Sequence, residues 1–356
     1  MQRRQLLQGA AAGVLLSGCG WTLGNVRSPI TGSNPNELYI YTWAGYTDER
    51  LLAQFEQQTG IRVVADTFES NESMLAKLQA GGGGAYSIIY PSDYMVKKML
   101  DLALLQPLDK SLIFGLDQLF PRFQNPRYDP SNRHSVPIAW GTTGLLYNPQ
   151  KVGPVTDWQF LWANQAKLRR RITLLNDVRE TMGAALKKLG YSYNSTNPQQ
   201  IQQAYQELVK LKPAIAAFTS DGWRPQLLAG DLFICMCYSS DAKQVISENQ
   251  TFQYTVPSSG SSFFIDTLVI PRTAPNPQGA YAWINFLLQP DIAAQVVEQL
   301  EFATPNQAAF TKLTAAKQQD QTLFPSPAVL AKLESLEPIG SATATFEEYW
   351  TRLTSS

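Results

Sequence analysis

The sequence predicts an α/β fold with two domains. Apolar runs of strand length alternate with helical patterns along most of the 356 residues, which is typical of a mostly parallel sheet covered by helices on both faces. At about 150 residues per domain, this length indicates two domains. Hydrophobic residues make up 44% of the chain, which is enough to build a core in each of them.

A first series of elements follows Glu37. We expect strands at 38–42, 61–68 and 86–90 and helices at 48–59, 71–80 and 93–100. Gly60 directly follows the first helix, where a glycine commonly ends a helix. The glycines 81–84 end the second helix and precede a strand, whereas phosphate-binding loops lead from a strand into a helix. We therefore interpret these four glycines as a cap and a loop.

A second series follows Trp140-Gly-Thr-Thr-Gly. We expect strands at 172–175, 232–238 and 263–270 and helices at 179–189, 198–211, 278–288, 291–299 and 343–353. Cys235 and Cys237 alternate along one of these strands, so their side chains face the same way. A disulfide two residues apart is geometrically awkward, and two thiols are too few for a closed zinc site. We interpret both as buried free thiols.

Charge and histidine content exclude several classes of function. Lys and Arg number 29 and Asp and Glu also number 29, so no net charge attracts nucleic acid, and we expect no nucleic-acid partner. The single histidine, His134, is expected in a surface loop. One histidine cannot build a His-based triad or a multi-His metal site within this chain. We expect no metal and no other cofactor.

Residues 1–18 have the pattern of a secretory signal. Arg3 and Arg4 precede an apolar run that ends at Leu16 and is too short to span about 30 Å of hydrocarbon. Leu16-Ser-Gly-Cys19 resembles a bacterial lipobox, which implies that Cys19 receives lipid and becomes the first mature residue. The alternative is ordinary secretion, with Cys19 in the discarded peptide. The paired arginines also resemble a twin-arginine signal, so the Sec and twin-arginine export routes both stay open.

Aromatic and acidic side chains gather just after the predicted strands, and one further pair, Phe264 and Asp266, lies on one face of the predicted strand 263–270. In open α/β sheets, ligands bind outside the carboxyl ends of the strands. Aromatic faces attract ammonium groups, and carboxylates give them charge-assisted hydrogen bonds. This constellation indicates an organic cation as ligand. The residues concerned are Trp43, Tyr46, Ser92, Asp93, Tyr94, Asp177, Glu180, Tyr238, Asp241, Phe264 and Asp266.

Each of these residues also has a purely structural interpretation. Asp177 and Glu180 have the spacing of a helix capping box, and Asp93 can cap the helix that it begins. The aromatic residues can belong to the core. The functional interpretation is favoured because aromatic and acidic residues recur together at five strand ends.

At these residues the sequence resembles the spermidine/putrescine-binding proteins, the extracytoplasmic solute receptors of polyamine ABC transporters. The resemblance covers about residues 37 to 352. It implies a two-lobed periplasmic-binding fold of type II, with the ligand in a cleft between lobes that close about a hinge. The motifs are Leu38-Tyr-Ile-Tyr-Thr-Trp-Ala-Gly-Tyr46, Phe68-Glu-Ser-Asn-Glu-Ser-Met-Leu-Ala-Lys-Leu78, Asp177-Val-Arg-Glu180, Lys188-Leu-Gly-Tyr191, Ile284-Asn-Phe-Leu-Leu288, Thr304-Pro-Asn306 and Phe346-Glu-Glu-Tyr349.

The resemblance also implies a division of the chain. After the signal, residues 19–36, rich in Gly, Ser, Asn and Pro, are expected to be a flexible tether. The N-terminal lobe is expected to comprise 37–141 and 265–310, and the C-terminal lobe 142–264 and 311–356.

The family's ligand-binding positions fall on residues of fitting chemistry in this chain. The aromatic box would be Trp43, Tyr46, Tyr94, Tyr238, Phe264 and Phe302, the amine-holding acids Asp177, Glu180 and Asp266, and Ser92 and Ser220 would also line the cleft. Two positions depart from the family. Gly45 stands where a glutamate is expected, and Leu336 or its neighbourhood replaces a glutamine. With three carboxylates left for two or three ammoniums, the polyamine stays open, with a preference for a shorter or differently ended one.

The resulting hypothesis is a lipid-anchored, extracytoplasmic receptor that captures putrescine or spermidine and delivers it to ABC permease subunits. We expect a monomer that contacts the membrane only through the lipid on Cys19. Three alternatives remain: a receptor of the same fold for another organic cation or small solute, an enzyme on this fold, and a membrane-tethered scaffold. The enzyme is disfavoured because no nucleophile and base stand out together.

Overall fold

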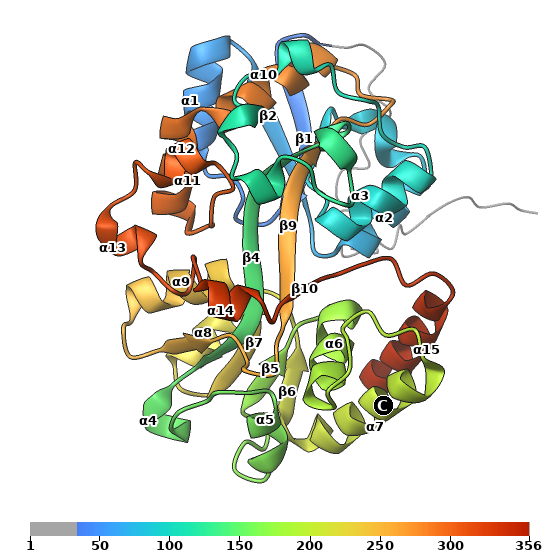
Figure 1. Ribbon diagram of the computed structural model, residues 1–356, viewed down its shortest axis with the longest axis vertical. Helices are drawn as coiled ribbons and strands as arrows, with labels where there is room; N and C mark the ends of the chain where they lie inside the picture. The colour runs from blue at the N-terminus through green and yellow to red at the C-terminus, as the bar shows by residue number, and fades with distance from the viewer. Residues whose placement is uncertain (1–33, 356) are drawn as a thin grey trace, which may run out of the picture.

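The computed structural model describes residues 34–355 and has two lobes joined by two long strands (Figure 1). The joining strands are β4 (Ser135–Tyr147) and β9 (Ser262–Val269), which pair antiparallel and run from one lobe into the other. The strand order is β2-β1-β3-β9-β4-β7-β5-β6, with β8 beside β4 and β10 beside β9. The predicted signal, Cys19 and most of the predicted tether lie outside the described residues.

The upper lobe in Figure 1 contains the first predicted series. Strands β1 (Glu37–Trp43), β2 (Arg62–Phe68) and β3 (Ile88–Ile89) are parallel. Asp48 caps the first helix by accepting from the Leu51 amide, and Gly60 ends it at φ +72°, as expected. The helices are α1 (Glu49–Thr59), α2 (Asn71–Gln79), α3 (Asp93–Asp101), α10 (Pro277–Leu288), α11 (Pro290–Leu300), α12 (Gln307–Phe310) and α13 (Ala315–Gln318).

The lower lobe contains β5 (Ile172–Leu174), β6 (Ile215–Phe218) and β7 (Ile234–Tyr238), again in parallel. Two short strands, β8 (Gln253–Thr255) and β10 (Glu334–Ser335), complete the sheet. The helices are α4 (Pro149–Val152), α5 (Gln159–Ala163), α6 (Val178–Lys188), α7 (Pro198–Leu211), α8 (Arg224–Leu228), α9 (Ser239–Glu248), α14 (Pro327–Leu330) and α15 (Ala342–Ser355). Short 3-10 turns lie at 82–85, 110–112, 116–118, 121–123, 130–132 and 212–214.

The expected elements are all present, most with ends moved by one or two residues. The predicted strand 86–90 is shorter than expected, and β4 and β6 were not predicted at all. The sheet is parallel within each lobe but antiparallel where β4 and β9 join the lobes, so the expectation of a mostly parallel sheet holds only for its outer parts. Among residues 34–355, no helix is both long and apolar enough to cross a bilayer.

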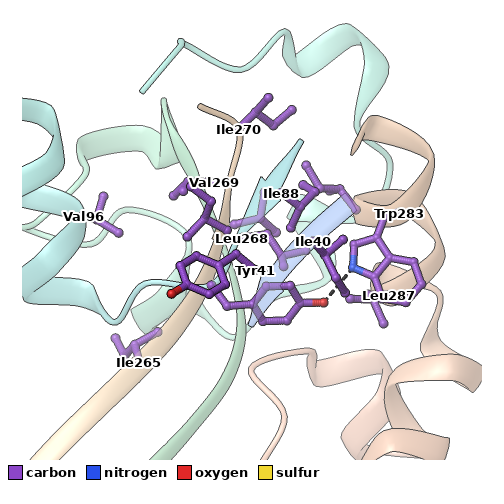
Figure 2. Close-up of a cluster of buried hydrophobic side chains, with 14 of the residues drawn as sticks. Ile40, Tyr41, Ile88, Val96, Ile265, Leu268, Val269, Ile270, Trp283 and Leu287 are labelled. Carbon is purple, nitrogen blue, oxygen red and sulfur yellow. Dashed lines mark hydrogen bonds between the residues drawn. The ribbon is translucent and has the colours of Figure 1, made fainter. Parts of the chain in front are cut away.

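Separate hydrophobic cores stabilise the two lobes. In the upper core, Ile40, Ile88 and Leu268 from three neighbouring strands pack near Trp283 of α10, whose indole N–H donates to the Tyr90 hydroxyl at 2.7 Å (Figure 2). The lower lobe has a large cluster around β5, α6, α7 and α15 and a small one that includes Cys235 and Cys237. Both thiols are free and buried, as expected.

The lobe limits expected above remain a prediction. Leu313 and Leu323 pack in the upper core although 311–356 was assigned to the C-terminal lobe, whereas Phe346 and Leu353 pack in the lower core.

Candidate functional site

A cavity of about 810 Å³, open to solvent, lies between the two lobes. All eleven predicted ligand-binding residues line it. Most follow the ends of β1, β3, β5, β6 and β7, and two lie on the joining strand β9. Phe302 is the second residue after α11. The carboxyl ends of the parallel strands of both lobes therefore face one another across this cavity. The eleven residues are Trp43, Tyr46, Ser92, Tyr94, Asp177, Glu180, Ser220, Tyr238, Phe264, Asp266 and Phe302.

Asp266 is held by two hydroxyl groups from the upper lobe. The Ser92 hydroxyl donates to its Oδ1 at 2.6 Å, and the Tyr46 hydroxyl donates to its Oδ2. Asn71 fixes Ser92 in turn, through two hydrogen bonds of 3.1 Å. Burial raises the pKa of Asp266 to about 6, against the lowering effect of the two hydroxyls. Neither partner carries a positive charge, so the carboxylate is oriented but not neutralised.

Asp177 and Glu180 begin α6 on the other side of the cavity. Asp177 caps this helix by accepting from the amides of Arg179 and Glu180 at 2.8 and 3.0 Å, so the predicted cap is present. The capping box is not complete, because the Glu180 side chain does not bond the Asp177 amide. The Glu180 side chain accepts from the Ser262 hydroxyl at 2.9 and 2.7 Å. Burial and the nearby Asp177 raise the pKa of Glu180 to about 8, and burial raises that of Asp177. Both residues combine a structural role with a place in the cavity wall.

Four further carboxyl groups line the cavity and were not among the eleven residues assigned to the ligand: Glu69, Asp93, Asp221 and Asp241. Burial raises the pKa of Asp93 well above its ordinary value, and it raises that of Asp241 to about 7 against the nearby Arg224. Asp93 and Asp241 stand in strand-end segments that the sequence singled out, so their position was the available signal, although Asp93 also had a structural interpretation as a helix cap. Asp221 follows Ser220 after β6, a strand that the sequence did not reveal.

Three carboxylates were expected to hold the ligand, and four more line the same cavity. Seven carboxyl groups line the cavity, and no Lys, Arg or His side chain of the described chain lines it. His134 lies outside it, at a turn before β4, where its Nδ1 is 3.2 Å from Asp129 Oδ1. Such a wall attracts a ligand with several positive charges, because Asp93, Glu180 and Asp266 are buried, and buried carboxylates without cations are costly.

Aromatic rings line the same cavity as the acids. Tyr238 and Phe264 meet edge to face with ring centroids 5.1 Å apart, and Tyr46 and Phe302 lie 4.1 Å apart. Trp43 packs on Phe68, an aromatic lining residue that the prediction missed. Ring faces and carboxylates in one cavity are suited to ammonium groups linked by methylenes.

Tyr94 links the cavity wall to charged groups behind it. Its hydroxyl donates to Glu72 Oε1 at 3.0 Å, and the Arg179 guanidinium lies 6.0 Å from its ring centroid. Arg179 also donates to the Glu337 carbonyl, next to the lining residue Leu336. The buried arginine thus belongs to the supporting structure and not to the cavity surface.

The two departures from the family pattern differ in position. Leu336 is 5% exposed and lines the cavity, so an apolar group stands where an amide was expected. Gly45 does not line the cavity. Its φ of +79° is a conformation that side chains rarely adopt, and no atom lies within 4 Å of where a Cβ would stand.

Comparison with known proteins gives a family and a set of relatives. Residues 50–325 match the model of the bacterial extracellular solute-binding proteins. A spermidine/putrescine-binding periplasmic protein of Salmonella typhimurium is 38% identical over 323 residues, which cover 90% of this chain and 92% of that protein.

Solved structures agree with this similarity. A putative spermidine/putrescine ABC transporter protein from Listeria monocytogenes superposes with a TM-score of 0.85 at 36% identity, covering 89% of this chain and 98% of that one. A lipoprotein of Treponema pallidum superposes with a TM-score of 0.80 at 29% identity, covering 90% and 100%. The expectation of a two-lobed periplasmic-binding fold is confirmed.

Proposed function

The chain belongs to the family of bacterial extracellular solute-binding proteins, and we propose that it captures a polyamine, putrescine or spermidine, and delivers it to an ABC transporter. The observation that carries this proposal is the cavity wall of seven carboxyl groups and six predicted aromatic residues without a lining cation among the described residues. The name of the Salmonella relative, a spermidine/putrescine-binding protein, supports the same ligand class.

The chemistry of a polyamine fits this wall better than that of other small solutes. Each ammonium group provides the positive charge that a buried carboxylate lacks, and each methylene between ammoniums gains about 0.8 kcal/mol when buried against a ring. A neutral sugar would cover the rings but would leave the acids without partners. Of the receptor alternatives, only another organic cation meets the same requirements.

The two candidate polyamines make different demands on the cavity. Spermidine has about three more methylenes than putrescine, worth roughly 2.4 kcal/mol if fully buried, but its additional amine needs a partner. Asp93 and Asp241 add carboxyl groups to the three expected from the sequence, which removes the shortage that disfavoured a triamine. Leu336 supplies no hydrogen bond at its position in the wall. These two features favour opposite ligands, so a direct comparison of affinities decides between them.

We propose that the eleven predicted residues contact the ligand, with Asp266, Asp177 and Glu180 as its principal carboxylate partners. Asp93 and Asp241 join them because they line the same cavity and burial raises the pKa of each. The family is one of transport proteins and not of enzymes, and the proposed function requires no catalysis.

The relatives are periplasmic proteins, which supports an extracytoplasmic location. We propose in addition that lipid on Cys19 anchors the chain, as a monomer, to the membrane where the permease subunits lie. The lipobox-like Leu16-Ser-Gly-Cys19 and the existence of a lipoprotein among the structural relatives support the anchor.

Isothermal titration calorimetry tests the ligand. Residues 20–356 are titrated with putrescine, spermidine and spermine, and the variants are Asp266→Ala and, as a matched control, the exposed surface acid Asp101→Ala. We expect micromolar or tighter binding of at least one polyamine, lost in Asp266→Ala and retained in Asp101→Ala. Folded wild-type protein that gives no heat with any of the three would overturn the polyamine proposal.

A further inference from the structure

Helix α9 touches both the cavity and the opposite lobe. Its first turn lines the cavity through Ser240 and Asp241. Its inner face, with Ala242 and Val245, packs in the small core of the lower lobe. Figure 1 places α9 at the upper edge of that lobe, below α11 and α13.

Three side chains in the later turns of α9 make polar contacts away from the cavity. Lys243 Nζ lies 2.6 Å from Asp320 Oδ2, in an ion pair whose side chains are only 17% and 15% exposed. Gln244 donates its amide to the Leu300 carbonyl at 3.1 Å. The Ser247 hydroxyl donates to Glu301 Oε1 at 3.1 Å.

The acceptors of these contacts belong to the upper lobe. Leu300 is the last residue of α11, a helix whose Ile292 and Val297 pack in the upper core. Asp320 lies in the segment between Leu313 and Leu323, which pack in the same core. All three contacts therefore cross from one lobe to the other.

Glu301 is fixed in place by two further features. It ends α11 at φ +60°, an uncommon conformation for a residue with a side chain. Its second carboxylate oxygen accepts from Lys317 of α13 at 2.5 Å. The next residue, Phe302, lines the cavity. The segment that receives the contacts from α9 thus continues directly into the ligand site.

Gln244 is oriented from its other end as well. Its side-chain carbonyl accepts from Arg224 at 2.6 Å, so its amide group is free to point to Leu300. This arrangement fixes which end of the amide faces the upper lobe. A glutamate at this position would keep the bond from Arg224 but would have no proton to donate to the carbonyl.

We propose that Lys243, Gln244 and Ser247 form a latch between the lobes and are positioning residues for ligand capture. This inference rests on the proposed function, because it assigns these residues to the same polyamine site. These contacts hold the two lobes in the arrangement that the structure shows, so they raise the fraction of molecules in that arrangement. The apparent dissociation constant equals the intrinsic one divided by that fraction. The three residues thereby affect affinity without touching the ligand.

The test compares three substitutions with a matched control. Lys243→Ala and Asp320→Asn each remove the ion pair between these two residues, and Gln244→Glu removes the bond to the Leu300 carbonyl. Lys312→Ala removes the 2.7 Å ion pair with Asp291, which lies within the upper lobe, and serves as control. We expect the dissociation constants for putrescine and spermidine to rise roughly threefold to tenfold for each latch variant and not for the control. The paired reversal of Lys243→Asp with Asp320→Lys should restore affinity.

A second measurement does not depend on polyamine binding. Spin labels at Asp101→Cys in the upper lobe and Lys210→Cys in the lower lobe, both exposed in the native chain, report the distance between the lobes in the ligand-free protein. We expect the latch variants to shift this distance distribution to longer values relative to the control. If wild-type protein binds no polyamine but the latch variants still shift the distance distribution, the proposed function fails and the latch stands. Unchanged distances and unchanged affinities in all three latch variants would overturn the latch.

Discussion

Two glutamates on adjacent helices illustrate the difference between the cavity and the rest of the molecule. Glu207 of α7 accepts hydrogen bonds from Lys188 and Lys210. Burial alone would raise its pKa, but the two lysines lower it below its ordinary value. Glu180 of α6 has no such partner, and burial together with Asp177 raises its pKa to about 8.

The comparison separates two kinds of carboxylate. Those outside the cavity, such as Glu207, are neutralised by lysines of the chain, whereas those of the cavity have no lining cation among the described residues. A buried acid without a cation weakens the ligand-free protein, because its charged form is poorly solvated. The cavity retains seven carboxyl groups in its wall. A positively charged ligand in the cavity would offset this unfavourable solvation of the buried carboxylates.

The largest effect should come from exchanging these two glutamates for glutamine. Glu180→Gln removes a proposed ligand partner, and we expect its polyamine affinity to fall about 30-fold to 5000-fold, the range for truncating one member of a buried charged pair. Glu207 lies outside the cavity, so the polyamine affinity of Glu207→Gln should equal that of wild type. Calorimetric titration of both variants decides the matter. Equal losses in the two would show that the contrast between the glutamates has no functional meaning.

The same two variants should have opposite effects on stability in the ligand-free protein. Because the folded pKa of Glu180 is raised from 4.5 to about 8, this residue costs stability as the pH rises through that interval. Glu180→Gln should therefore increase the free energy of unfolding by about 1–3 kcal/mol at pH 8 and change it little at pH 4. Glu207→Gln should lower it by about 0.5–1.5 kcal/mol at pH 7. Urea denaturation at pH 4, 7 and 8 measures these changes.

A lysine introduced into the cavity should neutralise its carboxylates, as Lys188 and Lys210 neutralise Glu207. Leu336 lines the cavity at 5% exposure, so Leu336→Lys brings an ammonium group to the acids. We expect polyamine affinity to fall about 10-fold to 100-fold, because the lysine competes with the ligand for the same carboxylates. Leu336→Met is the apolar control and should bind as wild type does. Undiminished affinity in the folded lysine variant would contradict the role assigned to the unpaired acids.

Binding should also depend on pH, with a somewhat smaller effect. Burial raises the pKa of Asp266 to about 6 and that of Asp241 to about 7, so part of the cavity is protonated near neutral pH. An ammonium ligand prefers the ionised carboxyls, and polyamine amines, with pKa values of about 10, remain charged up to about pH 9. Affinity should therefore rise about tenfold between pH 5.5 and 8.5, with release of protons. Titrations in buffers of different ionisation enthalpy measure that release, and a flat pH profile would count against it.

The contrast between the two kinds of acid was only partly predictable from the sequence. The position of residues after strands identified Asp177 and Glu180, because parallel strands end at a common edge. Asp266 was identified as part of an aromatic and acidic pair with Phe264 on one face of a strand. Asp93 had an equally good local explanation as a helix cap, and only the packing of both lobes decides that it lines the cavity. The spacing of Glu207 and Lys210 on one helix was visible in the sequence, but the pairing with Lys188 was not, since Lys188 lies on another helix.

Strand β4 could not be predicted from the sequence because it contains a proline and two glycines. Pro137, Gly141 and Gly144 interrupt the strand pattern and are typical of loops. In the structure, a Cβ on Gly144 would stand 2.4 Å from the Thr255 carbonyl oxygen, and one on Gly141 would stand 2.6 Å from the Phe264 ring. These glycines allow close approach of neighbouring strands and of a cavity aromatic, which a local sequence pattern does not reveal.

The smallest expected effect tests the already neutralised side of the comparison. Lys210 is 63% exposed, and it shares Glu207 with the more buried Lys188. Removing it in Lys210→Ala leaves the carboxylate with one cation, and exposed ion pairs contribute little, so unfolding free energy should change by less than about 0.5 kcal/mol. Lys188→Ala should cost more than Lys210→Ala, because its ion pair is only 13% exposed on both sides. Chemical denaturation at low and high salt measures both, and neither variant should alter polyamine affinity. A loss of affinity in either one would mean that the charges outside the cavity act on it at a distance, and that the separation between self-neutralised and ligand-neutralised acids is incomplete.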